Sequence, residues 1–325
     1  MTAKTPRILI TGAAGQIGSE LTPLLRQKYG AENVVASDIK TDISSNLLES
    51  GPYETLDVTD KKRIQEVIQI QHIDFIFHMS AILSAAGEDR PQLAWDVNMN
   101  GTHNILEAAR LMKIEKVFVP SSIAVFGPGT PSNDTPQETV LRPQTMYGVT
   151  KVAGELLCDY YVQRYGLDVR GCRYPGIISY QTLPGGGTTD YAVAIFYDAV
   201  EHSRYLCFLS EDTMLPMMYM PDCLKATIKL MEADFSRLKH HSDFNIAGMS
   251  FTAGELAAEI KKHLPEFQIE YKPDYRQQIA ESWPKSIDDT AARTEWDWQP
   301  DYDLPAMTKD MLKVLQERQA HTNLD

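Results

Sequence analysis

The chain has 325 residues, of which 43% are hydrophobic and 23% are charged, and its formal net charge at pH 7 is -13. This length is enough for one large domain or two smaller ones with a substantial buried core. The negative charge disfavours binding to a phosphate backbone, so we expect no nucleic acid partner.

The sequence carries no signal for secretion, for membrane insertion or for a zinc site. We find no run of about 18 apolar residues, the length that a membrane-spanning helix needs. Residues 1–7 are too short for a signal peptide before the first strand-like run. The cysteines form no CxxC pair and no cluster with histidine at zinc spacing. We therefore expect free thiols, no metal, no membrane partner and a cytoplasmic location.

Short apolar runs alternate with longer amphipathic stretches over the first half of the chain. The runs predict strands, and the stretches predict helices. The predicted strands are residues 7–11, 33–37, 74–78, 116–120 and 168–173, and the predicted helices are 17–25, 61–70, 95–112 and 147–166. This alternation is typical of a doubly wound parallel α/β sheet, the Rossmann fold, with helices on both faces.

The regular alternation stops after Tyr174, where glycine clusters, prolines and isolated helices replace it. We predict a Rossmann domain at residues 1–175, to which part of the later chain returns. We predict a smaller, irregular substrate-binding cap at residues 176–325. Such a cap closes over the carboxyl ends of the strands, where ligands of doubly wound folds bind.

A glycine-rich turn, Gly12-Ala-Ala-Gly15-Gln16-Ile17-Gly18, follows the first predicted strand and opens the first predicted helix. Glycine permits the tight turn and lets a pyrophosphate approach the backbone. Asp38 ends the second strand, 20 residues beyond Gly18. A carboxylate there accepts hydrogen bonds from ribose hydroxyls and repels a 2′-phosphate, so the pattern predicts NAD rather than NADP. The alternative for Asp38 is a helix cap, and Lys40 lies nearby.

Three more residues are candidate cofactor contacts. Asp57 and Val58 lie in the loop before the helix at 61–70, where they suit the adenine edge. An N-cap role for Asp57 or Asp60 explains that loop equally well. Ile177, just beyond the last predicted strand, is the third candidate.

Tyr147 and Lys151 lie four residues apart at the start of the helix at 147–166. Residues at this spacing share a helix face, so the ammonium can approach the phenol. A tyrosine with its reference pKa of about 10 is a poor base at neutral pH. A neighbouring lysine and a positive nicotinamide ring stabilise the phenolate, which makes the pair a candidate catalytic base. Lys151 can also bond the nicotinamide ribose.

Two serines follow the predicted strand at 116–120, at the mouth of the same cleft. A hydroxyl there can orient a substrate alcohol or the carbonyl formed from it. We predict Ser122 rather than Ser121 for this role, with simple strand termination as the alternative.

Together, the glycine turn, the serine and the YxxxK spacing resemble the extended short-chain dehydrogenase/reductase family. Tyr219-Met-Pro-Asp222 looks like the family's second-domain motif, and Asn98 matches an asparagine that supports the active-site end of its helix. His78-Met-Ser-Ala81 departs from the common alanine-rich version. The resemblance covers essentially the whole chain. It implies a homodimer, formed through the helices around 95–112 and 147–165.

Four segments resemble one branch of that family, the short-chain L-threonine dehydrogenases. They are residues 120–128, 173–179, 184–192 and 282–289, and the third, rich in glycine and threonine, is far more selective than YxxxK. This resemblance implies oxidation of L-threonine by NAD⁺ to 2-amino-3-oxobutanoate, the first step of a route of threonine catabolism. That β-keto acid can lose carbon dioxide to give aminoacetone.

A threonine site must hold a carboxylate and an ammonium and orient one alcohol. The backbone N–H of Gly187 and the hydroxyl of Thr188 suit the carboxylate, and Asp190 suits the ammonium. Ser80, at the end of a strand, is another candidate contact, and Trp283 is a candidate for closing the pocket against water. The alternatives are that the glycine-rich segment is only an ordered loop and that Trp283 only packs.

In the predicted reaction, phenolate Tyr147 removes the hydroxyl proton while Ser122 positions the oxygen. Lys151 holds down the pKa of the base and passes the proton towards solvent. The leading alternative is a nucleotide-sugar epimerase or dehydratase, which needs basic groups for a diphosphate. Between residues 175 and 235 the basic residues are Arg204, Lys225 and Lys229, which is sparse for a diphosphate clamp. Arg276 and Arg293 further along the chain leave this alternative open. A non-catalytic NAD-binding sensor is less favoured, because a sensor has no need of the base.

Overall fold

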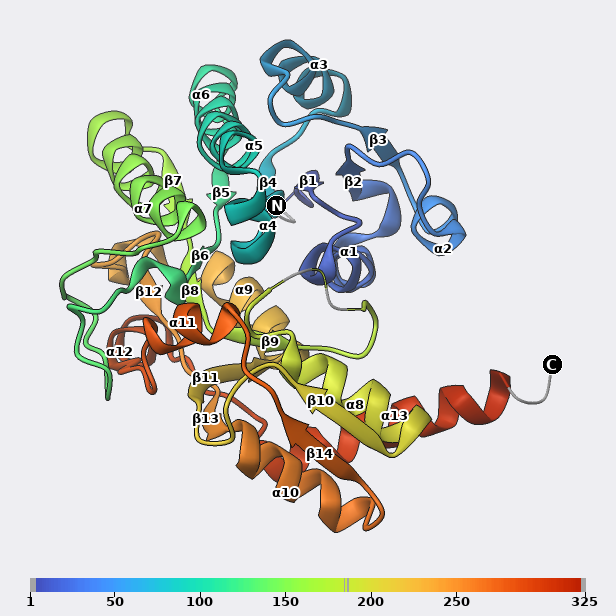
Figure 1. Cartoon of the computed structure of the whole chain (residues 1–325). Helices are drawn as coiled ribbons and strands as arrows, with labels where there is room; N and C mark the ends of the chain where they lie inside the picture. Colours follow the sequence, from blue (N-terminus) through green and yellow to red (C-terminus); the bar gives the residue numbers. More distant parts are fainter. Residues whose placement is uncertain (1–3, 184, 186, 323–325) are drawn as a thin grey trace.

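A six-stranded parallel sheet, in the order β3-β2-β1-β4-β5-β7, forms the centre of the N-terminal half (Figure 1). The computed structural model describes residues 4–183, 185 and 187–322. The strands of this sheet are β1 (Ile8–Thr11), β2 (Val34–Asp38), β3 (Tyr53–Thr55), β4 (Phe75–His78), β5 (Lys116–Phe118) and β7 (Asp168–Arg170). The strand order reverses between β1 and β4, and ligands of such sheets bind there, beyond the carboxyl ends of the strands. The predicted doubly wound α/β fold is confirmed.

Alternate residues of each strand enter two different hydrophobic cores, because successive side chains point to opposite faces of a sheet. Ile8 and Ile10 pack on one face and Leu9 on the other. The core containing Leu9 also includes residues of α3 (Lys61–Gln71), α6 (Gly101–Met112) and α7 (Met146–Tyr165). The opposite core includes residues of α1 (Gln16–Tyr29), α9 (Met220–Glu232) and α12 (Thr290–Trp296). Helices therefore cover both faces of the sheet.

Three elements differ from the predictions. The strand predicted at 168–173 divides at Gly171, where a Cβ would lie 2.1 Å from the carbonyl oxygen of Val119. Beyond it, β8 (Cys172–Tyr174) leaves the main sheet and pairs with β6 (Ser121–Ser122) and β12 (Phe244–Asn245). The helix predicted at 95–112 is preceded by α5 (Pro91–Trp95) and a π-helical turn, Asp96–Asn100. The short, partly exposed edge strand β3 was not predicted.

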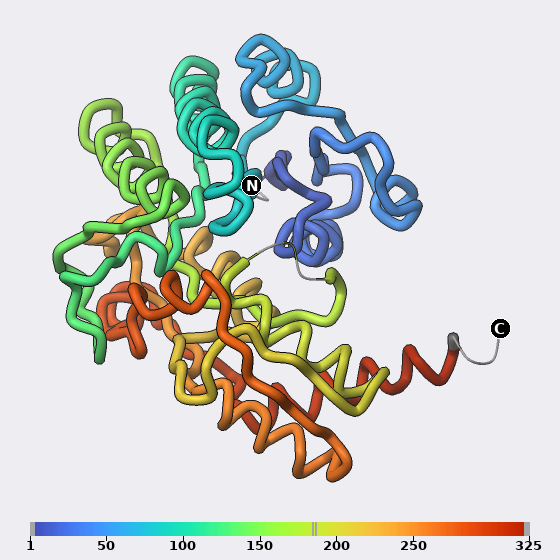
Figure 2. The backbone as a smooth tube through the Cα atoms, in the orientation of Figure 1, coloured from blue at the N-terminus to red at the C-terminus, as the bar shows by residue number. Residues whose placement is uncertain are grey.

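The cap contains two small sheets with their own hydrophobic core. Figure 2 shows most of the later chain, coloured yellow to red, below the blue and cyan segments of the N-terminal half. One sheet joins β9 (Gly176–Ile178), β11 (Met214–Tyr219) and β13 (Met249–Thr252), and the other joins β10 (Arg204–Cys207) and β14 (Gln268–Tyr271). The later half also contains the helices α8 (Tyr191–His202), α10 (Ala253–His263), α11 (Arg276–Glu281) and α13 (Leu304–Thr322). The first half also contains the short helices α2 (Ser45–Glu49) and α4 (Ser84–Asp89). Because α9 and α12 pack on the main sheet, the chain beyond residue 175 contributes to both halves.

The four cysteines, Cys158, Cys172, Cys207 and Cys223, are buried free thiols, as expected. None of the helices described here combines the length and the apolar character that crossing a membrane requires.

Candidate active site

An open cavity of about 210 Å³ lies between the carboxyl ends of the central strands and the cap. Most predicted site residues line it: Gly12, Gly15, Gln16, Ile17, Gly18, Ser122, Tyr147, Lys151, Ile177, Gly187, Thr188, Asp190 and Trp283. The sequence analysis missed other lining residues, among them Met79, Leu83, Ser84, Tyr174 and Gly176. Met79, Tyr174 and Gly176 fall within the segments 78–81 and 173–179 that resemble the family, but no role was predicted for them. For Leu83 and Ser84, only their position after a strand could have suggested a place in the site. Asp38, Asp57, Val58 and Ser80 are not among the lining residues described for this cavity.

The glycine turn is close-packed at two of its glycines. Gly12 has a φ of +69°, and a Cβ there would lie 2.7 Å from the backbone nitrogen of Ser80. A Cβ on Gly18 would lie 2.2 Å from the carbonyl oxygen of Gly12. Helix α1 begins immediately after Gly15 with no side-chain cap. Uncapped N–H groups at a helix N-terminus bind phosphate, so the turn fits the pyrophosphate of a dinucleotide.

The contacts of Asp38 and Asp57 decide between the alternatives for these residues. The Asp38 carboxylate accepts hydrogen bonds from the backbone N–H groups of Ala14, at 3.0 Å, and Lys40, at 3.1 Å. Neither N–H belongs to a helix, so Asp38 is not a helix cap. The N-cap of α3 is Asp60, whose carboxylate accepts from the backbone of Arg63. The Asp57 carboxylate instead accepts hydrogen bonds from the backbone N–H and the hydroxyl of Thr59.

Gln16 connects the glycine turn to the cap. Its side-chain amide donates to the carbonyl oxygen of Ile177, at 3.2 Å, and to the hydroxyl of Ser179, at 3.4 Å. The two predicted cofactor contacts Gln16 and Ile177 therefore lie together, although they are 161 positions apart in the chain.

Tyr147, Ser122 and Lys151 meet at one end of the cavity. Thr145 caps α7 by accepting from the backbone of Gly148, which puts Tyr147 in the first helical turn. The hydroxyls of Tyr147 and Ser122 are hydrogen-bonded. Lys151 Nζ lies 5.5 Å from the centre of the Tyr147 ring and donates to the carbonyl oxygen of Pro120 at 2.7 Å. A phenol, a hydroxyl and an amine are thus brought together as predicted from the sequence.

The two neighbouring serines have different partners. Ser121 is buried, and its hydroxyl donates to Glu155 Oε1 at 2.5 Å. Ser122 bonds Tyr147 and accepts from the backbone of Ala124. This geometry favours Ser122 as the hydroxyl that faces a substrate.

Burial controls the protonation of the tyrosine–lysine pair. It raises the pKa of Tyr147 to about 12, against the opposing effect of the Ser122 hydrogen bond. It also lowers the pKa of Lys151 to about 8, against the opposing effects of Cys158 and Glu155. The amine therefore loses its proton before the phenol ionises. Burial thus outweighs the groups that lower the pKa of Tyr147. The predicted lowering requires the positive charges of Lys151 and a nicotinamide ring together.

The glycine–threonine segment forms the cap side of the cavity. Asp190 Oδ2 accepts from the backbone N–H of Gly187 at 2.8 Å, and the buried hydroxyl of Thr188 lies 3.3 Å from that of Ser84. Trp283 lines the cavity and also belongs to the hydrophobic core of the cap. Residues 184 and 186 of this segment lie outside the described residues.

The charges around the cavity are few. Among the residues described as lining it, Lys151 is the one basic side chain and Asp190 the one acidic side chain. The basic residues considered for a diphosphate lie elsewhere: Lys225 pairs with Asp301, Lys229 bonds the backbone of Asp297, Arg276 pairs with Asp274, Arg293 pairs with Asp289, and Arg204 is exposed on β10. The cavity therefore lacks a cationic clamp within the described part of the chain.

Asn98 holds the loop after β4 against α7. Its side chain donates to the carbonyl oxygen of Ile82 at 3.0 Å and to Thr150 Oγ1 at 3.2 Å, and it accepts from the backbone N–H of Ile82 at 2.8 Å. The π-helical turn Asp96–Asn100 carries this residue, and such turns are frequent at functional sites. Asn98 thus supports the site from behind.

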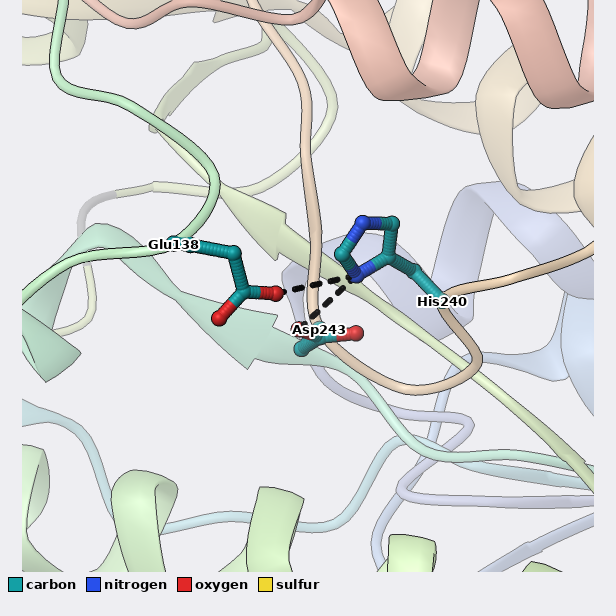
Figure 3. Close-up of side chains that lie close together, drawn as sticks. All are labelled: Glu138, His240 and Asp243. Carbon is teal, nitrogen blue, oxygen red and sulfur yellow. Dashed lines mark ion pairs between the residues drawn. The ribbon is translucent and has the colours of Figure 1, made fainter.

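An ion-pair cluster outside the cavity was not predicted (Figure 3). His240 Nδ1 lies 3.6 Å from Glu138 Oε1 and 3.5 Å from Asp243 Oδ2. Asp243 raises the pKa of His240, and Glu295 and Glu138 add to this effect, so the surrounding carboxylates favour the protonated form of the histidine. Among the described residues, these three are the one group whose side chains could jointly hold a metal ion.

Comparison with known proteins identifies the family. Residues 8–247 match the model of the NAD dependent epimerase/dehydratase family. The chain belongs to this family. It is therefore an NAD-dependent enzyme, and NAD is its cofactor, in agreement with the glycine turn.

Relatives match over almost the whole chain. An uncharacterized epimerase/dehydratase of Staphylococcus haemolyticus is 48% identical over 96% of this chain and 98% of its own. The structure of L-threonine dehydrogenase from Clostridium difficile is 52% identical over 97% of this chain and 98% of its own, with a TM-score of 0.94. A monomeric L-threonine 3-dehydrogenase from a metagenome is 48% identical over 96% and 99%, with a TM-score of 0.92.

Proposed function

We propose that this enzyme oxidises L-threonine to 2-amino-3-oxobutanoate with NAD⁺. The observation that carries the proposal is the charge content of the cavity, which has one described base, Lys151, and one described acid, Asp190. These charges suit a small zwitterion, whereas a nucleotide sugar brings a diphosphate that calls for several cations. The similarity to L-threonine dehydrogenases over the whole chain supports the same substrate.

In the proposed mechanism, Tyr147 is the general base and takes the proton of the substrate hydroxyl. Ser122, which is hydrogen-bonded to Tyr147, positions the oxygen of the substrate hydroxyl towards the phenolate. Lys151 carries a positive charge beside the phenolate and bonds the nicotinamide ribose. When bound, NAD⁺ supplies the hydride acceptor and a positive ring. The rest of the chain orients these groups and excludes water.

The cofactor is held by the glycine turn, with Gln16, Ile17 and Ile177 along its path and Tyr147 and Lys151 at the nicotinamide end. Asp38 lies beside the turn, where its carboxylate accepts the ribose hydroxyls and disfavours a 2′-phosphate. We assign Asp57 and Val58 to contact the edge of the adenine ring.

The cap holds the amino and carboxyl groups of the substrate. Asp190 takes the ammonium, and the paired hydroxyls of Thr188 and Ser84 face the carboxylate, with the Gly187 backbone beside them. Trp283 closes the cavity against water. Ser80 lines a second, narrower cavity behind Lys151, so we assign it a supporting role there.

Assembly as a homodimer is part of the proposal. Leu156, Tyr160 and Val149 are exposed on α7, with 66%, 50% and 41% of their surfaces accessible, and Trp95 is exposed on the adjoining α5 at 42%. An apolar face of this kind on adjoining helices suits contact with a second copy.

A substrate screen that follows NADH absorbance tests the proposed function. We expect NADH formation with L-threonine and none with a UDP-sugar. Turnover of a UDP-sugar with no NADH formed from L-threonine would replace this proposal with an epimerase or dehydratase.

A further inference from the structure

Helix α4 lies between the two ends of the proposed substrate site. Its first residue, Ser84, is buried and lines the large cavity, and its hydroxyl oxygen lies 3.3 Å from that of Thr188. One turn further along, the Glu88 carboxylate accepts a hydrogen bond from the backbone N–H of Met146 at 2.7 Å. Residues four apart share a helix face, so one face of α4 contacts the cap at one end and α7 at the other.

The Glu88 contact is at the beginning of the helix that carries the base. Met146 is the first residue of α7 and directly precedes Tyr147. The first N–H groups of a helix have no partner within it, and helix ends fray. Thr145 accepts from the N–H of Gly148, but it belongs to the same segment of chain. Glu88 binds the first turn from a different element, so it fixes the position of Tyr147 relative to α4.

The chain before α4 is also anchored to α7. Asn98 bonds both backbone groups of Ile82, and its amide donates to Thr150 Oγ1 on α7 at 3.2 Å. Between the two anchors, a Cβ on Gly87 would lie 3.8 Å from the Cβ of Tyr147, so the backbone of α4 passes close to the base. The segment from Ile82 to the end of α4 is therefore held on α7 at both ends.

The substrate of the proposed reaction requires a fixed spacing between these elements. The carboxylate and the hydroxyl of L-threonine are attached to adjacent carbons, so the distance between them varies little. In the proposed site the carboxylate faces Ser84 and Thr188, and the hydroxyl faces Tyr147. These residues belong to three separate segments of the chain. A displacement of about 1 Å between them is enough to cost about 10²-fold in rate.

We propose that Glu88 is a positioning residue, which holds the base Tyr147 at the spacing from Ser84 and Thr188 that a 2-amino-3-hydroxy acid requires. This inference rests on the proposed oxidation. Glu88 is not among the residues described as lining the large cavity, so we assign it no contact with the substrate. Its side chain is exposed, and solvent screens its charge. It acts through the oxygen that accepts the Met146 N–H.

Three variants of Glu88 separate the hydrogen bond from the charge. Glu88→Ala and Glu88→Met remove the acceptor and place good helix formers in α4. Glu88→Gln removes the charge and keeps an oxygen that can accept the same N–H. The matched control is Asp89→Ala, which removes the next carboxylate of α4, an exposed residue that is not described as lining either cavity. Thermal melts and calorimetric NAD⁺ binding establish that each variant is folded.

The first measurement is the rate of NADH formation with L-threonine at saturating NAD⁺. We expect kcat to fall about tenfold in Glu88→Ala and Glu88→Met, less than the roughly 10²–10⁴ of a group at the reacting atoms, with NAD⁺ affinity unchanged. Glu88→Gln and Asp89→Ala should keep the wild-type kcat. An equal loss in Glu88→Gln and Glu88→Ala would show that the charge acts instead, and would overturn the positioning role.

Hydrogen exchange gives a readout that does not depend on turnover. The amides of residues 146–149 should exchange faster in Glu88→Ala and Glu88→Met than in the wild type, because the first turn of α7 opens more often. Exchange in Glu88→Gln should match the wild type. Unchanged exchange in Glu88→Ala would contradict the claim that Glu88 holds this turn.

A double variant tests the connection along α4. If Glu88 sets the spacing from Ser84, its removal matters less once Ser84 no longer contacts the carboxylate. Losses at independent sites multiply to within about twofold. We expect the loss of kcat/KM in the Ser84→Ala, Glu88→Ala enzyme to be about fivefold smaller than the product of the two single losses. A loss within about twofold of that product would refute the connection.

Wild-type kcat in Glu88→Ala and Glu88→Met, with NADH formed from L-threonine, overturns the role of Glu88 and leaves the proposed oxidation intact. Absence of NADH with L-threonine in the wild type overturns the oxidation, and the role of Glu88 with it.

Discussion

Replacement of Lys151 by methionine tests how far its charge makes Tyr147 a base. A unit charge 5.5 Å from the ring stabilises a phenolate by about 3 kcal/mol at an effective dielectric constant of about 20. This energy corresponds to about two pKa units. In the Lys151→Met enzyme, the limb of the pH profile of kcat/KM that reports ionisation of the base should move up by about two pH units. Activity at pH 7 should fall about a hundredfold.

The assay is initial NADH formation with L-threonine between pH 6 and 10. The matched control is Lys151→Arg, which keeps the positive charge at all these pH values. We expect Lys151→Arg to keep the position of the limb even if its maximal rate falls. A Lys151→Met enzyme whose limb coincides with that of the wild type would refute the electrostatic role of the lysine.

Three other predictions follow from the packing and the charges. Gly18→Ala should raise the KM for NAD⁺ by about tenfold or more, since its Cβ would lie 2.2 Å from a backbone oxygen, while Gly129→Ala, with nothing within 4 Å, should leave it unchanged. His240→Gln should lower Tm most near pH 6 and less as the pH rises. The raised pKa of His240 stabilises the folded state fully below the unfolded pKa of about 6.5, and this contribution disappears as the pH rises through the folded pKa. An equal loss of Tm at pH 6 and pH 9 would contradict this. Leu156→Glu should shift light scattering from dimer to monomer, and a wild-type monomer would remove the dimer from the account.

The central sheet could be predicted because alternation is a local signal. Ile8, Leu9 and Ile10 are apolar without a break, which is how a strand covered on both faces differs from a half-exposed one. The break at Gly171 could not be predicted, since it depends on the close approach of Val119 from another strand. The edge strand β3 was not predicted because it is short and partly exposed.

The chemical site was predictable where the spacing in sequence matches the geometry of one element. Tyr147 and Lys151 lie on one helix, so their distance follows from helix periodicity. The pairing of Glu155 with Arg173 and the cluster around His240 join residues from separate elements. No local pattern specifies such contacts, and only the fold brings them together. The sequence analysis chose Ser122 over Ser121, and the different partners of the two serines, which no local pattern specifies, favour the same choice.

The most direct test of the central claim compares the wild type with Tyr147→Phe on L-threonine. The account predicts NADH formation by the wild type and a loss of about 10²–10⁴ in kcat for Tyr147→Phe, with NAD⁺ affinity, measured by calorimetry, nearly unchanged. A Tyr147→Phe enzyme that oxidises L-threonine at the wild-type rate would contradict the assignment of Tyr147 as the base.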